Sequence, residues 1–139
     1  MTFLEELSWR GMLYQTTGAE ALASHLATPG RTAYAGFDPT ADSLHVGHFV
    51  PIRLLMHFQR AGHRPIALVG GGTGLIGDPS GKDSERTLLD KERVEHNVAG
   101  IRRVLERFLD FSAGSTQASV VNNATWLSEL GFLEVLRTV

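Results

Sequence analysis

Apolar residues recur along this chain with two spacings that predict different elements. Short runs that are apolar almost throughout are typical of buried parallel strands; they cover residues 32–37, 65–69 and 119–122. Apolar positions three and four apart predict amphipathic helices; these cover residues 2–10, 19–27, 44–61 and 91–109 and the last segment of the chain. Strands that alternate with helices predict an α/β fold, a right-handed, Rossmann-like parallel sheet with helices on both faces, preceded by a helical leader over residues 1–30.

The helical patterns also predict which positions face the core. In the helix over 44–61 these are Val46, Phe49, Val50, Leu54 and Phe58. In the helix over 91–109 they are Val94, Val98, Ile101, Leu105 and Phe108. We expect the strand over 65–69 to be buried on both faces, and Pro51 to bend or weaken its helix because proline lacks an N–H group.

The last residues keep an apolar pattern without a cap or a polar tail. Leu133, Val135, Leu136 and Val139 belong to this pattern, which runs to the final position. A helix that stops there has terminal carbonyl groups without partners and an unfinished packing surface. We therefore expect the chain to be truncated, with a sheet that is incomplete at its C-terminal side.

Composition narrows the class of protein. The chain has 139 residues, 42% hydrophobic and 20% charged, with a formal net charge of −2, which fits one packed domain and argues against a globally basic nucleic-acid-binding surface. It has no cysteine, which excludes disulfides, thiolate catalysis and cysteine-bound zinc. No apolar run reaches the length of a membrane span, and the first residues are acidic, unlike a signal peptide. A soluble cytoplasmic protein is the expectation.

The first candidate site lies where the helix over 44–61 begins. His45 and His48 are three apart and share one face, with Gly47 between them. The positive end of the helix dipole favours neutral imidazoles, and the free backbone N–H groups there suit a phosphate, to which Thr40 adds a hydroxyl group. Two solvated histidines are the simpler alternative. A zinc site is a weaker one, because Asp38 is the only nearby third ligand.

The second candidate is the glycine-rich stretch over residues 70–86. Residues 72–77 match the G-x-G-x-x-G dinucleotide pattern, but we expect no helix to begin there because Asp-Pro-Ser-Gly follows at once. The phosphate-loop pattern fails, since Ile76 and Asp83 stand where it needs glycine and serine or threonine. We therefore expect a flexible loop in which the functional residues are Asp78, Lys82 and Arg86. An NAD(P)-type dinucleotide-binding module and an ordinary surface loop remain alternatives.

Both stretches together resemble a known family. Residues 34–48 closely resemble the first signature of the class I aminoacyl-tRNA synthetases, in the form found in the bacterial tyrosyl enzymes, and residues 61–82 are similar to the same family. So are residues 7–11 and 107–111, so the resemblance covers essentially the whole chain. It implies that residues 31–139 form the first part of a catalytic domain with the HUP-type nucleotide-binding fold of these enzymes.

The resemblance also implies roles for individual residues. It places Thr40 and His45 at the ATP phosphates, and Gly47 and His48 against the ribose and adenine. It places Gly36 and Asp38 beside the bound adenylate. Tyrosine-binding roles fall on Tyr34, Thr73 and Asp78, and Lys82 and Arg86 would close over pyrophosphate.

The implied activity is that of a tyrosine–tRNA ligase. Its substrates are L-tyrosine, ATP with Mg²⁺ and tRNA(Tyr), it has no prosthetic group, and its complete form is a homodimer that does not involve a membrane. The family's second signature, of Lys-Met-Ser-Lys-Ser type, and its anticodon-binding region are absent from these 139 residues. An inactive folding fragment is therefore the alternative for the isolated chain.

Overall fold

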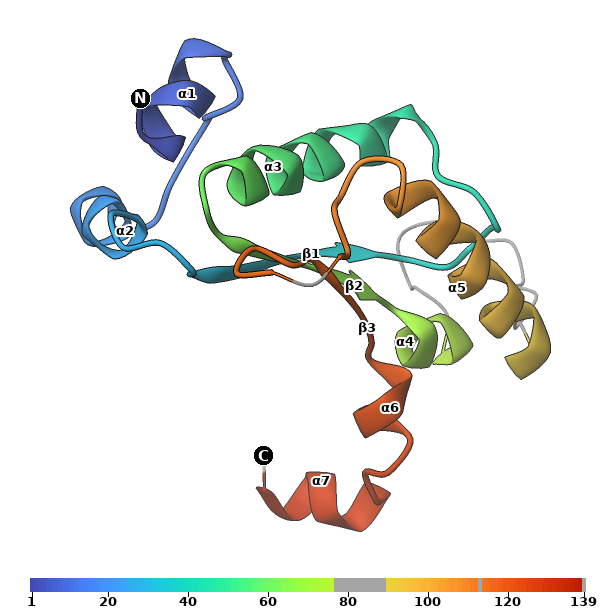
Figure 1. The fold of residues 1–139 in the computed structure, drawn as a ribbon. Coiled ribbons are helices and arrows are strands. Elements are labelled where there is room, and N and C mark those ends of the chain that lie inside the picture. The colour runs from blue at the N-terminus through green and yellow to red at the C-terminus, as the bar shows by residue number, and fades with distance from the viewer. Residues whose placement is uncertain (77–89, 113, 139) are drawn as a thin grey trace.

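The computed structural model describes residues 1–76, 90–112 and 114–138. Its centre is a parallel sheet. Its strands are β1 (Thr32–Phe37), β2 (Arg64–Val69) and β3 (Ser119–Asn122), in the spatial order β1-β2-β3. Thr32 pairs with Arg64 and Ile66 with Ser119, so all three strands run in the same direction. The predicted strands and their parallel arrangement are confirmed, and the carboxyl ends of the strands meet at one edge of the sheet (Figure 1).

Helices α3 (Phe49–Arg60) and α5 (Lys91–Leu105) pack against the sheet in one shared hydrophobic core. Ile52 and Leu55 of α3 meet Ile101 and Leu105 of α5 there, and all four are at most 2% exposed. Both crossovers step across the sheet in the same direction, and right-handed crossovers of this kind place their helices on the same face. The expectation of helices on both faces is therefore not met in the part of the chain that the structure describes.

The opposite face of the sheet is more open. In β2, Ala67 and Val69 are completely buried, whereas Ile66 and Leu68, which alternate with them and point to the other face, are only partly buried. In β1, Tyr34 on this face is 70% exposed. The expected burial of β2 on both faces is therefore wrong for the described residues, because one face alone carries the packed helices.

The start of α3 differs from the expectation, and its core face differs with it. Residues 46–48 form a 3₁₀ turn, η1 (Val46–His48), so the α-helix begins only at Phe49. Val46 is 87% exposed and Val50 66% exposed, while the buried positions are Ile52, Leu55, His57 and Phe58. The predicted core face is wrong except at Phe58, because the helix is apolar on several sides and the crossover decides which side meets the sheet.

Pro51 does not interrupt this helix. Because α3 begins at Phe49, Pro51 lies in the first turn, where backbone N–H groups have no acceptor within the helix. The expected bend came from placing the helix start too early in the chain.

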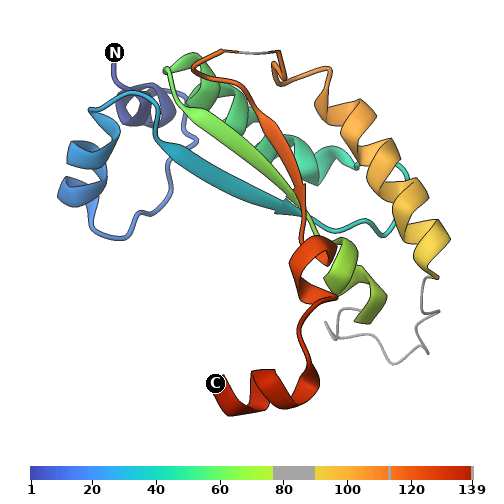
Figure 2. The same cartoon turned by 60° about the horizontal axis from the view of Figure 1, so that its bottom comes forward.

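In α5 the predicted core positions Val94, Ile101 and Leu105 are confirmed, since all three are buried. The remaining helices are short. A helix, α4 (Gly71–Ile76), follows β2 directly, where a loop was expected. Helices α6 (Ala124–Leu127) and α7 (Phe132–Thr138) follow β3 and extend away from the sheet beyond its carboxyl edge (Figures 1 and 2). Among the described residues, no helix has the length and apolar character needed to cross a membrane.

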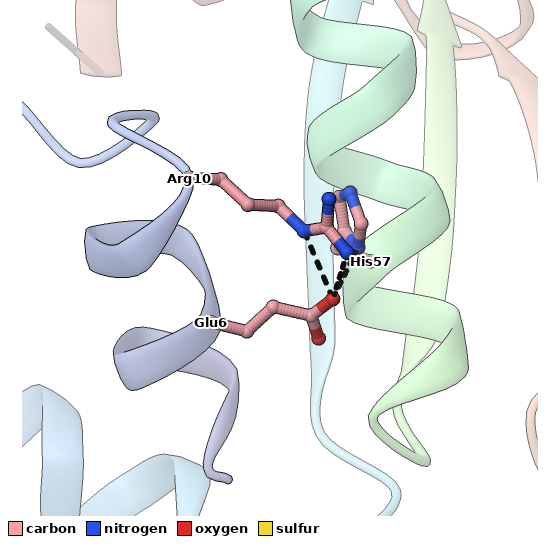
Figure 3. Close-up of polar contacts among 3 residues, drawn as sticks. All are labelled: Glu6, Arg10 and His57. Atoms are coloured by element: carbon pink, nitrogen blue, oxygen red, sulfur yellow. Dashed lines mark hydrogen bonds and ion pairs between the residues drawn. The ribbon is translucent and has the colours of Figure 1, made fainter.

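The leader forms the helices α1 (Phe3–Trp9) and α2 (Ala19–Leu26). Phe3 packs edge-on against Phe58 of α3, with ring centroids 5.4 Å apart. Beside this contact, Glu6 accepts from Arg10 at 3.0 Å and lies 3.2 Å from Nδ1 of His57, which is 1% exposed (Figure 3). The leader is thus attached to the back of α3 by an aromatic contact and a charged one.

Candidate functional site

The candidate site occupies the carboxyl edge of the sheet, where the segments after β1 and β2 touch. The N–H of Gly70 donates to the carbonyl of Phe37 at 3.0 Å. A Cβ atom on Gly70 would lie 3.0 Å from Oδ1 of Asp38 and 2.6 Å from Oγ1 of Thr73. A side chain at position 70 would therefore push apart two of the predicted site residues, so the glycine allows the two segments to meet.

His45 and His48 form a reciprocal cap at the start of η1. Nδ1 of His45 accepts from the N–H of Gly47 at 3.0 Å, and Nδ1 of His48 accepts from the N–H of His45 at 3.3 Å. The two ring centroids are 3.8 Å apart. Each imidazole is thus held by a hydrogen bond from a backbone N–H group of the same short segment. The sequence spacing alone did not reveal this arrangement.

This geometry decides where each imidazole carries its proton. A ring nitrogen that accepts a hydrogen bond holds no proton, so a neutral ring at either position has its proton on Nε2. Burial, with the nearby His45 ring, lowers the pKa of His48, which favours the neutral form. Each ring can therefore donate one N–H bond through Nε2 to an anion without itself carrying a charge.

Gly47 is required for this cap. A Cβ atom at this position would lie 2.8 Å from Cε1 and 3.0 Å from Nδ1 of His45, inside the range that real side chains avoid. Any side chain at position 47 would displace the His45 ring, so the glycine keeps that ring in place as well as leaving the backbone accessible.

Two predicted site residues, Tyr34 for the tyrosine and Gly36 for the adenylate, lie on the open face of β1. Tyr34 and Gly36 are two apart, so they point to the same face of the strand, and both are exposed. A Cβ atom on Gly36 would meet nothing within 4 Å, so a ligand could approach the backbone closely here. The structure thus places Tyr34, Gly36 and Asp38 in sequence along one edge that leads toward the histidine pair.

Asn123 is a residue that the sequence reasoning missed. Its Oδ1 accepts from the N–H of Gly72 at 2.7 Å, and its Nδ2 donates to Oγ1 of Thr73 at 3.2 Å. Thr73 in turn donates to the carbonyl of Gly70 at 3.2 Å. One amide therefore holds both the first turn of α4 and a predicted site residue, and the only signal in the sequence was an asparagine pair at the end of a predicted strand.

Asp78, Lys82 and Arg86 lie outside the described residues, as does the end of the glycine-rich stretch. Their grouping with the histidine pair therefore stays a prediction.

The described residues do not favour the alternative sites. They contain no group of three or more histidine and carboxylate side chains that could hold a metal ion. The glycines of the dinucleotide pattern lie inside α4, where Gly72 packs against Ala124 and Gly74 against Pro39, with hypothetical Cβ contacts of 3.2 Å each. In a dinucleotide fingerprint the first glycine forms the tight turn before the helix. Here the first glycine of the pattern, Gly72, already lies inside α4.

Comparison with known proteins identifies a family and several relatives. The family described as tRNA synthetases class I (W and Y) matches residues 28–139. The chain is 55% identical over 138 residues to the tyrosine–tRNA ligase of Roseiflexus castenholzii, covering 99% of this chain and 32% of the relative. It is 54% identical to the tyrosine–tRNA ligase of Streptococcus mutans, covering 100% of this chain and 33% of the relative. The chain thus spans about a third of the length of the curated relatives it matches.

Solved structures show the same relationship. A C-terminally truncated mitochondrial tyrosyl-tRNA synthetase of Coccidioides posadasii superposes with a TM-score of 0.77 at 30% identity, covering 99% of this chain and 39% of that one. The corresponding protein of Aspergillus nidulans gives a TM-score of 0.78 at 28% identity, covering 98% of this chain and 41% of that one.

Proposed function

The chain belongs to the tRNA synthetases class I (W and Y), and from this premise we propose that it forms the ATP- and tyrosine-binding N-terminal part of a tyrosine–tRNA ligase. Curated relatives at 52–55% identity carry that name, and their match covers essentially all of these residues. In this proposal residues 1–30 are a helical leader and residues 31–139 the first part of the catalytic domain. The reaction takes place in the cytoplasm.

The proposed reaction has two steps. A carboxylate oxygen of L-tyrosine attacks the α-phosphorus of ATP, which arrives as its magnesium complex; a new P–O bond forms, and pyrophosphate leaves with the electron pair of the broken one. The tyrosyl group then passes from the adenylate to the terminal ribose of tRNA(Tyr). The first step needs no nucleophile or general base from the protein, because the attacking carboxylate is already ionised. Positioning and charge stabilisation carry it.

The histidine pair performs this positioning in our proposal. Nδ1 of His45 is occupied by the backbone, so Nε2 is the atom that donates to a phosphate oxygen as pyrophosphate leaves. Thr40, exposed on the preceding segment, adds a hydroxyl donor to the same phosphates. His48 and Gly47 lie against the ribose and adenine.

The open face of β1 receives the amino acid. Tyr34 reaches the substrate phenol, and Thr73, held by Asn123, lines the same side. Gly36 and Asp38 border the adenylate. Asp78 binds the α-ammonium group, and Lys82 and Arg86 close over the pyrophosphate. In the complete enzyme we expect tRNA(Tyr) as the second substrate and a homodimer as the assembly.

The observation that carries the proposal is the paired imidazole cap at the sheet's carboxyl edge, with two N–H donors available through Nε2. The test is ATP–pyrophosphate exchange with tyrosine, measured on the natural polypeptide that contains these 139 residues. His45→Ala should slow adenylate formation by about 2–4 kcal/mol in activation free energy, the scale of one transition-state donor. The matched control is Val46→Ala, at the neighbouring exposed position, which should leave the rate close to that of the parent.

Two results would contradict this proposal. An unchanged exchange rate in His45→Ala removes the role of that imidazole. Tight calorimetric binding of NAD(H), with none of ATP, replaces the ligase by a dinucleotide-binding module. A separate single-turnover measurement with labelled ATP decides whether the 139-residue chain alone forms any adenylate.

A further inference from the structure

The segment that carries Thr40 is held by a helix that is remote in sequence. Asn97 of α5 donates from Nδ2 to the carbonyl of Pro39 at 2.8 Å, across 58 residues of sequence. That carbonyl belongs to the peptide unit between Pro39 and Thr40, so the bond fixes the plane from which the Thr40 side chain projects. Asn97 is completely buried, which leaves its amide no alternative partner in solvent.

A second contact holds the same segment three residues further on. A Cβ atom on Gly100 would overlap the carbonyl oxygen of Asp42, so α5 approaches the backbone there more closely than any other residue type would permit. His96, one residue before Asn97, lies 3.7 Å from a carboxylate oxygen of Asp42. One face of α5 therefore contacts the segment at two peptide units, on both sides of Thr40.

The far side of the segment is closed as well. Pro39 is buried, and the glycine at position 74 of α4 leaves only 3.2 Å between a hypothetical Cβ and Cγ of Pro39. The segment between β1 and η1 is thus packed between α4 and α5. Asp38 and Thr40 are exposed, while the backbone on either side of Thr40 is held by these contacts.

A role in packing alone does not account for Asn97. It occupies the apolar stripe of α5, three residues after Val94 and four before Ile101, where a leucine would bury more apolar area. Within the part of the chain that the structure describes, its Oδ1 has no hydrogen-bond partner, and a buried polar atom of this kind is unfavourable. Among the described residues the amide makes one hydrogen bond, and that bond is to the peptide unit of a predicted catalytic residue.

We propose that Asn97, supported by the close approach of α5 at Gly100, is a positioning residue that holds the Pro39–Thr40 peptide so that Thr40 meets the leaving phosphates. This inference rests on the proposed function. A misplacement of about 1 Å at a reacting group, caused from a distance, costs about 10²-fold in rate. We therefore expect loss of the Asn97 donor to slow adenylate formation without weakening the binding of tyrosine, which is taken up on the open face of β1.

The test uses the natural polypeptide that contains these residues, with active sites counted by titration. Asn97→Asp keeps the shape of the side chain and, at a pH where the new carboxyl group is ionised, removes the donor. It should lower the rate of adenylate formation by about 10²-fold, with the tyrosine dissociation constant, measured without ATP, unchanged within about twofold. Ile101→Val is the matched control, since Ile101 lies on the same helix, is completely buried and has an aliphatic side chain that cannot donate a hydrogen bond to the Pro39 carbonyl.

A double-mutant cycle separates positioning from mere destabilisation. If Asn97 acts through Thr40, the variant carrying both Asn97→Asp and Thr40→Ala should be little slower than Thr40→Ala alone, because the residue being positioned is already lost. If Asn97→Asp lowers the rate by the same factor in the Thr40→Ala background as in the parent, the proposal is overturned. A loss of rate in Ile101→Val as large as that in Asn97→Asp would also overturn it. If Asn97→Asp fails to fold, Asn97→Leu takes its place in the same cycle with the same two criteria, because leucine also lacks the donor and suits the apolar stripe.

The failure of this inference is distinguishable from that of the proposed function. A parent protein that forms no tyrosyl-adenylate contradicts the function itself. A parent that is active, with Asn97→Asp or Asn97→Leu equally active, contradicts only the positioning role.

Discussion

Replacing Gly47 with alanine separates the stability of the histidine cap from its chemistry. The new Cβ atom would lie 2.8 Å from Cε1 of His45, so the exposed imidazole must rotate away, and its bond to the Gly47 N–H is lost. The backbone itself is not strained, because Gly47 is not among the glycines with positive φ. The substitution therefore removes one hydrogen bond and relocates one ring.

The effects on folding nearly cancel. Loss of a side-chain N-cap costs about 1 kcal/mol, and replacement of glycine by alanine at a compatible position returns about 0.4–1 kcal/mol through the unfolded chain. We expect the free energy of unfolding of Gly47→Ala to stay within about 0.5 kcal/mol of the parent. Urea denaturation of the 139-residue chain followed by circular dichroism measures this.

The effect on chemistry is much larger. If Nε2 of His45 donates to the leaving phosphates, its displacement costs about 2.7–4 kcal/mol in the transition state, or 10²–10³-fold in the rate of adenylate formation. Single-turnover kinetics on the full-length natural polypeptide measures the rate, and the exposed neighbour Val46→Ala serves as the control.

A second comparison identifies the cause. An alanine at position 47 could also obstruct the nucleotide directly. If it acts only by displacing the ring, combining it with His45→Ala should add almost nothing to the loss in His45→Ala. Additive losses would refute the displacement argument, and an unchanged rate in Gly47→Ala would refute the role of the cap altogether.

Two further predictions concern specificity and pH. Tyr34→Phe should reduce discrimination between tyrosine and phenylalanine in ATP–pyrophosphate exchange, because a phenol-directed donor on the open face of β1 is lost; tyrosyl enzymes are the established example of such discrimination, at about 10⁵-fold, and unchanged selectivity would reject the assignment. Burial lowers the pKa values of His48, His57 and His63, with Glu6 opposing the shift at His57, so protonation favours the unfolded chain. The free energy of unfolding should be greatest above about pH 6.5 and fall as the pH drops through that value toward the lowered pKa values; urea denaturation at several pH values tests this, and a flat profile would contradict it.

The sequence alone determined the three parallel strands, the two long helices between them and the pairing of two histidines before α3. Buried parallel strands and an amphipathic helix such as α5 are recognisable from local spacing, because each must present apolar side chains with its own period. The histidine pair was also visible, since residues three apart at a helix start share a face whatever surrounds them. Local chemistry was sufficient for both.

The tertiary structure decided what local spacing leaves open. Helix α3 is apolar on more than one side, so only its crossover to β2 selected Ile52 and Leu55 rather than Val46 and Val50 for the core. The helical start of the glycine-rich stretch depends on Asn123, which is 51 residues away from Gly72. The hold of Asn97 on Pro39 spans 58 residues. Such contacts depend on how the chain crosses the sheet, and no window of neighbouring residues contains that information.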